Sequence, residues 1–252
     1  MWTDEQFEQL EQDERTLTEE AIIALLLTLS TSRSNLEKEL RSFYQKYGRD
    51  GVVTWQEVRK WVSNEDHRKR LTVLLLILAD EFDSLYSKLN PEFDSFLQDI
   101  VEKELKFFDS DLEVNALTTP WGVDDATWVT RLADDVEIWK LYVANDLKQA
   151  FLRKDDVEKV ITKLNKRFTT MENVIQKLAM TESTAIGSLA RREIFKELGI
   201  TKYKYYARED ERTCEVCGSL HGLIFPISSY EVGVTASPMH PWCRCWEVPI
   251  RD

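Results

Sequence analysis

The fold predicted for the C-terminal part of this chain depends on two short stretches, Cys214-Glu215-Val216-Cys217 and His240-Pro241-Trp242-Cys243, which 22 residues separate. Each stretch has the spacing at which a tight turn can aim two ligands at one tetrahedral ion. Cys245 adds a further thiol on the same side as Cys243 if that segment is extended. The sequence therefore predicts one structural zinc ion, a closed site with no place for a catalytic water. Its candidate ligands are Cys214, Cys217, His240, Cys243 and Cys245, with the choice between the last two left open.

The same cysteines have two alternative arrangements. They could form two disulfides, or they could be four free thiols packed as small apolar groups. All 4 Cys and two of the 3 His lie between residues 214 and 245, which is hard to reconcile with random packing. The first residues have neither the basic start nor the apolar stretch of a secretion signal, so we expect a reducing cytosol, where disulfides are rare. His221, beside Gly222, is expected to be a turn residue and not a ligand.

The segment after Leu198 is too short to bury much core of its own, with 54 residues. Structural zinc contributes on the order of 10 kcal/mol to the folding of small domains, so a metal would substitute for the missing core. Tyr203, Tyr205 and residues 223–225 are β-prone and bounded by Gly222 and Pro226, which predicts short strands of a small sheet. Residues 199–252 are therefore expected to form a C-terminal zinc-binding module.

The rest of the chain is expected to be nearly all helix, because apolar residues recur at helical spacing over long windows. Thr3 with Gln6 and Thr54 with Glu57 have the pattern of helix-starting capping boxes. We expect Pro91 to begin a helix and a helix over residues 155–168 to end before another over 170–198. The aperiodic stretch 109–122 is the best candidate linker.

These patterns predict a mainly α protein: an elongated helical body with a small C-terminal α+β module stapled by zinc. The expected domains are an N-terminal helical domain over residues 1–118, a helical segment with a basic face over 119–198, and the zinc-binding module over 199–252. The longest apolar runs, residues 21–29 and 71–79, are far below the roughly 20 residues that a bilayer span needs, so no membrane span is expected.

Charge is unevenly distributed along the chain, whose formal net charge is -12. A chain this acidic is a poor candidate for wrapping DNA with its whole surface. Residues 148–204 are the exception, with 13 Lys and Arg against 7 Asp and Glu. A solvated helical face is the commoner explanation of such a segment.

The residues around the cysteines resemble a known family. The run Asp210-Glu211-Arg212-Thr213-Cys214, then Leu220, Gly222 and Phe225, then Pro238-Met239-His240-Pro241-Trp242-Cys243-Arg244-Cys245, closely resembles the C-terminal signature of the phage Mu F-like minor head proteins, the phage head morphogenesis family. Upstream, Ala179-Met180-Thr181-Glu182 is similar to the family's Arg-Thr-Glu element, and the resemblance covers roughly residues 120–252.

Two positions depart from the family pattern. Met180 stands where the family usually has Arg, and His221 stands where an acidic or amide residue is common. If the pair Thr181-Glu182 has no other role, it would simply cap the start of a helix, with Thr181 accepting from the first turn and Glu182 near the positive helix end.

The resemblance implies a virion component without enzymatic activity, a low-copy minor capsid protein that joins the prohead in the host cytoplasm. It implies a place inside the capsid at the portal vertex, with the portal protein as partner and the major capsid or scaffolding protein as further candidates. It also implies an association with DNA packaging or ejection, in which residues 148–204 could contact phage DNA or an acidic portal surface.

Two other function classes compete with this one. A zinc-containing nuclease or toxin-like enzyme would need a general base and a further metal- or phosphate-binding group near the zinc, and only His221, Asp210 and Glu211 are available. A zinc module for DNA binding predicts a basic tail. Residues 205–252 instead hold 4 Lys and Arg against 7 Asp and Glu, which argues against that class.

Overall fold

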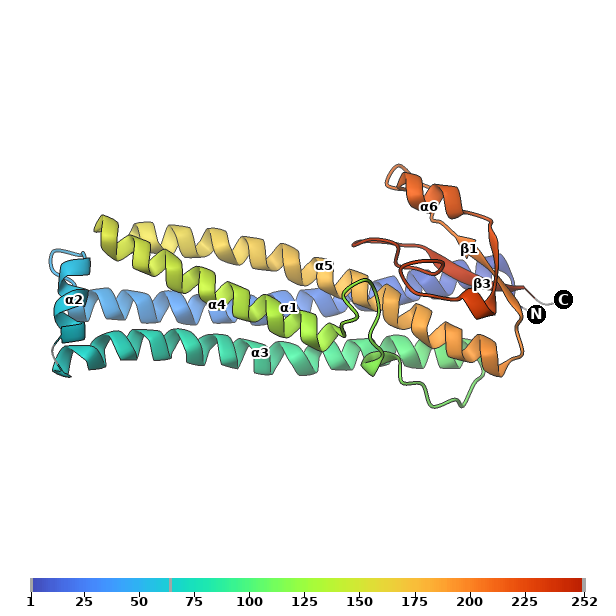
Figure 1. The fold of residues 1–252 in the computed structure, drawn as a ribbon, viewed down its shortest axis with the longest axis horizontal. Helices are drawn as coiled ribbons and strands as arrows, with labels where there is room; N and C mark the ends of the chain where they lie inside the picture. Colours follow the sequence, from blue (N-terminus) through green and yellow to red (C-terminus); the bar gives the residue numbers. More distant parts are fainter. Residues whose placement is uncertain (1, 64, 251–252) are drawn as a thin grey trace. The chain divides into compact units, whose positions relative to one another are not determined.

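The computed structural model describes residues 2–63 and 65–250, except for the side chains of residues 60–73 and 75. Long helices dominate it (Figure 1): α1 (Asp4–Tyr47), α3 (Glu65–Phe108), α4 (Trp128–Arg153) and α5 (Val157–Glu197), with the short α2 (Trp55–Ser63) between the first two. The expected linker contains the 3-10 turn η1 (Ala116–Thr118) and, at Trp121, one residue of an isolated β-bridge to Ala126. The prediction of a mainly α fold is therefore confirmed. No helix among the described residues is both long enough and apolar enough to cross a membrane.

The C-terminal part contains a small antiparallel sheet of strands β1 (Lys202–Tyr206), β2 (Ile224–Pro226) and β3 (Trp246–Ile250). Strand β1 is central, and Tyr203 lies opposite Phe225 on one side and Pro249 on the other. Alternation along β1 points Tyr203 and Tyr205 inward, where both are fully buried. The helix α6 (Glu215–Leu220) and the 3-10 turn η2 (Ile227–Ser229) lie on either side of β2 in the sequence, which confirms the α+β character of this part.

Helix starts agree with the predicted capping boxes. The Thr3 hydroxyl accepts from the Gln6 backbone N–H at 3.2 Å while the Gln6 side chain accepts from the Thr3 N–H at 2.9 Å. Thr54 and Glu57 make the same reciprocal pair at 3.2 and 3.0 Å. Local sequence is sufficient at these two ends because both partners lie within one helical turn.

Two expected helix boundaries are wrong. Pro91 lies inside α3 and does not begin a helix, and α5 runs without a break through residues 168–170. A proline inside a helix removes one backbone hydrogen bond at a cost of about 3 kcal/mol. The helix continues because the neighbouring Leu89 and Phe93 are both fully buried, and α5 continues because the buried Phe168 and Met171 carry on its apolar stripe.

The chain divides into two compact units, each built from separate pieces of sequence. One contains Ala24–Asn90 and Leu132–Ile175, and its core consists of apolar side chains spaced three or four apart along α1, α3, α4 and α5. Fully buried members include Leu29, Leu85 and Phe168. This unit is a packing of four helices, and its core contains no cysteine.

The other unit contains Met1–Ile23, Pro91–Arg131 and Gln176–Asp252. Aromatic rings connect its elements: Phe108 lies 5.5 Å from Phe195 between ring centroids, Phe195 lies 6.4 Å from Tyr230, and Tyr230 lies 4.6 Å from Tyr203. The sheet therefore packs on α5 and shares a core with α3. The expected domain boundaries at 118/119 and 198/199 stay predictions about independent folding, which limited proteolysis would test.

Candidate metal centre

The first ligand pair is positioned by the start of α6. Cys214 is the residue before the helix, and its Sγ accepts a hydrogen bond from the Cys217 backbone N–H at 3.3 Å. This contact is the thiol equivalent of a side-chain N-cap. Because Cys217 follows in the first turn, both sulfurs lie on one side of the helix end, with Cys217 buried and Cys214 half-buried.

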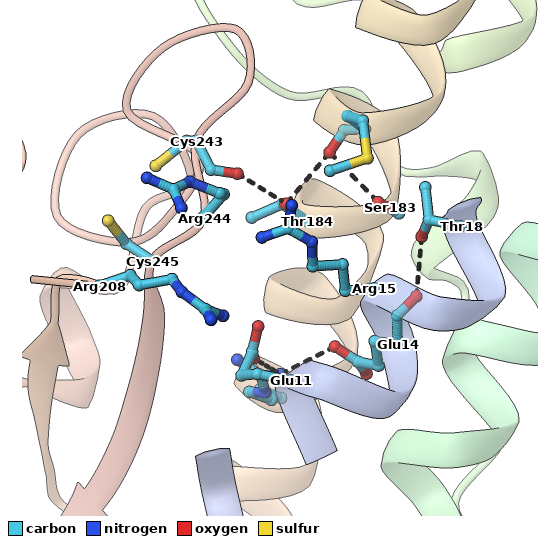
Figure 2. Close-up of a pocket in the computed structure, with 12 residues that line it drawn as sticks. Glu11, Glu14, Arg15, Thr18, Ser183, Thr184, Arg208, Cys243, Arg244 and Cys245 are labelled. Carbon is cyan, nitrogen blue, oxygen red and sulfur yellow. Dashed lines mark hydrogen bonds and ion pairs between the residues drawn. The ribbon is translucent and has the colours of Figure 1, made fainter. Parts of the chain in front are cut away.

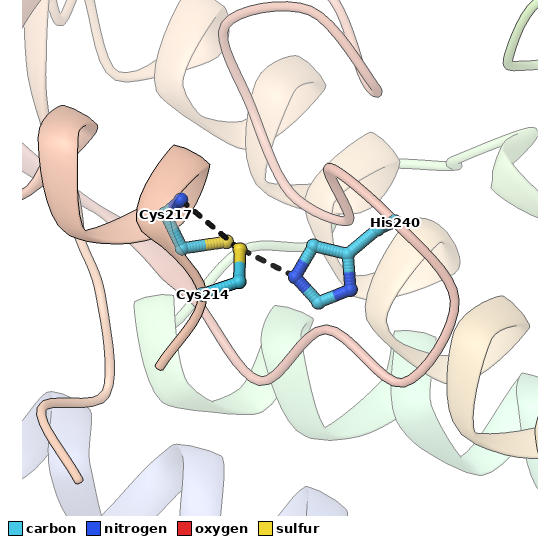
Figure 3. A group of neighbouring side chains, drawn as sticks. All are labelled: Cys214, Cys217 and His240. Atoms are coloured by element: carbon cyan, nitrogen blue, oxygen red, sulfur yellow. Dashed lines mark hydrogen bonds between the residues drawn. The ribbon is translucent and has the colours of Figure 1, made fainter. Parts of the chain in front are cut away.

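The second ligand pair comes from the loop before β3. The Cys243 backbone N–H donates to the His240 carbonyl at 3.1 Å, which closes a tight turn. Trp242, between the two ligands, has φ of 65°, a left-handed conformation that residues other than Gly and Asn seldom adopt. The turn therefore directs His240 and Cys243 toward α6, as Figure 3 shows for the His240 ring.

All five candidate ligands come together in two overlapping triads. Cys214, Cys217 and His240 form one, and Cys217, Cys243 and Cys245 form the other, with the donor atoms of each triad within 4.8 Å of one another. Cys217 is common to both. Its Sγ lies 3.3 Å from His240 Nε2 and 3.8 Å from Cys243 Sγ.

These separations fit a tetrahedral zinc site. Zn–S bonds of about 2.3 Å and Zn–N bonds of about 2.0 Å place two sulfurs about 3.8 Å apart and a sulfur and a nitrogen about 3.5 Å apart. A disulfide needs about 2.05 Å between sulfurs, and all four cysteines are free. The donor set of thiols and one imidazole is also the set that zinc prefers in structural sites.

Hydrogen bonds orient His240 and favour the thiolate form of Cys243. The Nδ1 atom of His240 lies 2.7 Å from the Pro241 carbonyl oxygen, so a proton on Nδ1 donates there and leaves the Nε2 lone pair facing Cys217. The hydrogen bond between Cys217 and Cys243 raises the pKa of Cys217 and lowers that of Cys243, because one thiol donates to the other thiolate. A thiolate is the form of cysteine that binds metal.

An ion pair joins the two ligand-bearing segments. Arg244 donates through both terminal nitrogens to the Asp210 carboxylate, at 2.5 and 2.6 Å. The same carboxylate accepts from the Arg212 backbone N–H at 2.8 Å. These hydrogen bonds, that of Arg244 first, hold the pKa of Asp210 well below its usual range. Asp210 is therefore committed to bridging the segments that carry the cysteines.

The other residues of the C-terminal module that the sequence singled out include His221, which makes a hydrogen bond to the backbone. The His221 Nδ1 atom accepts from the Ala207 backbone N–H at 3.2 Å, and His221 ends α6, so it is a turn residue as expected. Trp246 is buried and stacks on Tyr206 with ring centroids 5.2 Å apart. Trp242 is 45% exposed.

Thr181 and Glu182 do not cap a helix, because they lie well inside α5. Glu182 is buried and accepts from Trp121 Nε1 at 2.8 Å and from Arg131 Nη1 at 2.7 Å. Burial raises the pKa of Glu182, and the Arg131 guanidinium opposes that shift. The capping interpretation is therefore wrong for this pair, and Glu182 anchors the loop before α4 to α5.

A buried charge cluster, which sequence reasoning missed, lies in the same unit. Arg191 is 2% exposed, and its Nη2 atom contacts carboxylates of Glu11, Glu14 and Glu104, with Glu247 within 4.0 Å of Nη1. The sequence did carry a signal for it. Glu14 and Glu104 fall on the apolar stripes of α1 and α3, where a charged residue indicates a buried partner.

A cavity of about 40 Å³ lies between this cluster and the cysteine loop (Figure 2). It is lined by Glu11 and Glu14 on one side and by Cys243 and Cys245 on the other. Gly187 of α5 allows the close approach of the carboxylates, because a Cβ there would lie 3.3 Å from Glu104 Oε1. The cavity is large enough for a water molecule and too small for a substrate.

A family match covers the candidate metal centre. The model of the family described as Phage Mu protein F like protein matches residues 142–248, about two fifths of the chain. All five candidate ligands lie within the match, and the resemblance found in the sequence is confirmed. Residues 142–248 are therefore similar to the family of Phage Mu protein F like proteins. No curated protein and no solved structure matches the chain.

Proposed function

We propose that this chain is a phage minor head protein that acts through protein contacts in head morphogenesis, with one structural zinc ion in its C-terminal module. The observation that carries the proposal is the coincidence of the family match with the cysteine–histidine cluster. The function follows from the family, and the metal follows from the donor geometry. The two parts are therefore tested separately.

The proposed zinc ligands are Cys214, Cys217, His240 and Cys243. The separation of 3.8 Å between the sulfurs of Cys217 and Cys243 supports Cys243 as the fourth ligand, with Cys245 as the alternative. Bound zinc would supply four bonds that hold α6 and the loop before β3 together. Elemental analysis of the purified chain should give one zinc per chain, and a folded C-terminal module without metal would exclude the site.

A nuclease or toxin-like enzyme is the competing function. Five protein donors crowd the cluster, and Asp210 and His221 are each occupied by structural hydrogen bonds. This arrangement supports a closed structural site, since hydrolysis needs an open coordination position and a free base. Metal-dependent cleavage of DNA by the purified chain would overturn the non-enzymatic role.

The proposed partner is the portal protein, at the portal vertex inside the capsid, with packaging or ejection as the stage of action. The major capsid and scaffolding proteins are further candidates. Direct DNA contact through residues 148–204 has weaker support, because at least eight of its 13 basic side chains lie within 4.0 Å of a carboxylate oxygen.

The deciding experiment is purification of assembled heads from infected cells. We expect the chain to co-purify with the portal protein and to crosslink to it. A head population that contains portal but lacks this chain would refute the assignment to the portal vertex. Cryo-electron microscopy of those heads would place the chain directly.

A further inference from the structure

Two threonines of α5 contact the loop that carries the candidate ligands. The Thr181 hydroxyl oxygen accepts a hydrogen bond from the Trp242 backbone N–H at 3.2 Å. One turn further along α5, the Thr184 hydroxyl lies 3.2 Å from the Cys243 carbonyl oxygen, to which it donates (Figure 2). Both contacts are to the backbone of residues 242–243, between and at the proposed ligands His240 and Cys243.

Each hydroxyl is oriented by its own helix. The Thr181 hydroxyl donates to the Lys177 carbonyl at 2.7 Å, so its lone pairs are left to accept the Trp242 N–H. The Thr184 hydroxyl shares its proton between the Cys243 and Met180 carbonyls, the latter at 3.1 Å. Each threonine hydroxyl thus links the backbone of α5 to the backbone of the irregular loop by hydrogen bonds.

The loop needs such support because its conformation is unfavourable. A left-handed conformation is sterically disfavoured for a residue other than Gly, and Trp242 adopts it at φ of 65° between two ligands. Without external hydrogen bonds the turn would relax, and the His240 and Cys243 donor atoms would change direction. Groups that orient ligands in this way typically account for 10- to 100-fold in metal affinity.

The helix itself is held in place at this point. Glu182, adjacent to Thr181, is bound by Trp121 and Arg131 on another side of α5. Ser188 lies one further turn beyond Thr184, and its hydroxyl contacts Ser237 at 3.0 Å and donates to Glu247 at 2.9 Å. Three small polar residues along α5, Thr181, Thr184 and Ser188, therefore contact the segment from residue 237 to β3 at its start, at residues 242–243 and in β3.

We infer that Thr181 and Thr184 are positioning residues of the metal centre, which hold the His240–Cys243 turn in its ligating geometry and thereby set the zinc affinity. The inference rests on the zinc site proposed above. It gives a specific role to Thr181 of the Thr-Glu pair: Thr181 serves the ligand loop, and Glu182 serves the loop before α4.

The test compares metal binding by full-length variants. Zinc affinity would be measured by competition with a chromophoric chelator, and ligand geometry by the visible spectrum of the cobalt-substituted chain. We expect Thr181→Val and Thr184→Val each to weaken zinc binding by about 10-fold, and the double variant by up to about 100-fold, with altered cobalt bands. Thr181→Ser, which keeps the hydroxyl, should retain most of the zinc affinity of the unsubstituted chain.

Thr170→Val is the matched control. Thr170 also lies on α5 and donates to its own helix, to the Lys166 carbonyl at 3.2 Å, but it belongs to the compact unit that contains no cysteine. Zinc affinity of the double valine variant within twofold of the unsubstituted chain, or an equal loss in Thr170→Val, would overturn the inference. An unsubstituted chain that binds no zinc would instead refute the metal centre itself.

Discussion

Replacing Glu11 by Gln should make the free energy of unfolding less dependent on pH. The Nη2 atom of Arg191 carries two hydrogens, yet the carboxylates of Glu11, Glu14 and Glu104 all approach it. Glu247 faces the same guanidinium from β3, and Arg15 and Arg208 line the adjacent cavity. One buried guanidinium cannot compensate so many buried carboxylates, so part of the cluster must hold protons.

The sign follows from the direction of the shifts. Burial raises the pKa of Glu11 from 4.5 to about 7, and burial also raises the pKa of Glu14 and Glu104. The folded state therefore binds protons more tightly than the unfolded state does. The associated stability is fully present below about pH 4.5 and is lost as the pH rises through about 7.

The magnitude for Glu11 alone is about 3 kcal/mol, at 1.36 kcal/mol per pKa unit. This is an upper value, because 16% of the Glu11 side chain is exposed to solvent. The neighbouring carboxyls titrate together with Glu11. The loss of unfolding free energy therefore belongs to the whole group of carboxyls and is spread over several pH units.

The assay is urea unfolding followed by circular dichroism at pH 4 and pH 8. Between these values the unsubstituted chain should lose up to about 3 kcal/mol more of its unfolding free energy than Glu11→Gln does. The variant should therefore be the more stable of the two at pH 8. Glu20→Gln, on the exposed face of α1, is the control and should follow the unsubstituted chain. Equal pH dependence in Glu11→Gln and the unsubstituted chain would refute the buried-proton argument.

Three further predictions concern single side chains. Cys243→Ser should abolish stoichiometric zinc while Cys245→Ser retains about one equivalent by elemental analysis, and the reverse result would make Cys245 the fourth ligand. Phe168→Ala should cost about 3–5 kcal/mol in urea unfolding, because its ring is fully buried. The zinc content under native conditions should stay unchanged, because Phe168 lies in the unit without cysteines. A loss of zinc would show that the two units do not fold independently. Glu182→Ala should cost about 3 kcal/mol, since it leaves Arg131 without its buried partner, and an unchanged unfolding midpoint would contradict the anchoring role.

Features encoded within one or two helical turns could be predicted from the sequence. The capping boxes at Thr3 and Thr54 and the C-x-x-C turn at the start of α6 each depend on residues three apart. The second ligand pair was also predictable, because its spacing repeats the first. Pro91 was not, since local propensity disfavours a proline inside a helix and only the packing around it explains why α3 continues.

Contacts between distant segments were out of reach of spacing rules. Thr181 meets Trp242 across 61 residues, and Arg191 meets Glu11 across 180. In isolation the pair Thr181-Glu182 has the residue types of a helix cap, and only the three-dimensional fold shows that it lies inside α5. The better signal was the position of Glu14 and Glu104 on apolar stripes, because a charge at a core position requires a partner from another element.

The same contacts change how the charge pattern along the sequence should be interpreted. Residues 148–204 have an excess of basic residues, but Arg191 is buried among carboxylates, and Lys163 and Arg167 both bind Asp146. These cations compensate acidic residues of their own chain, so fewer of them are available to phosphate than the sequence count suggests. Binding to DNA through counterion release would weaken steeply with salt, in proportion to the phosphates neutralised. A partner contact of this chain that persists as salt rises would therefore favour a protein surface over DNA.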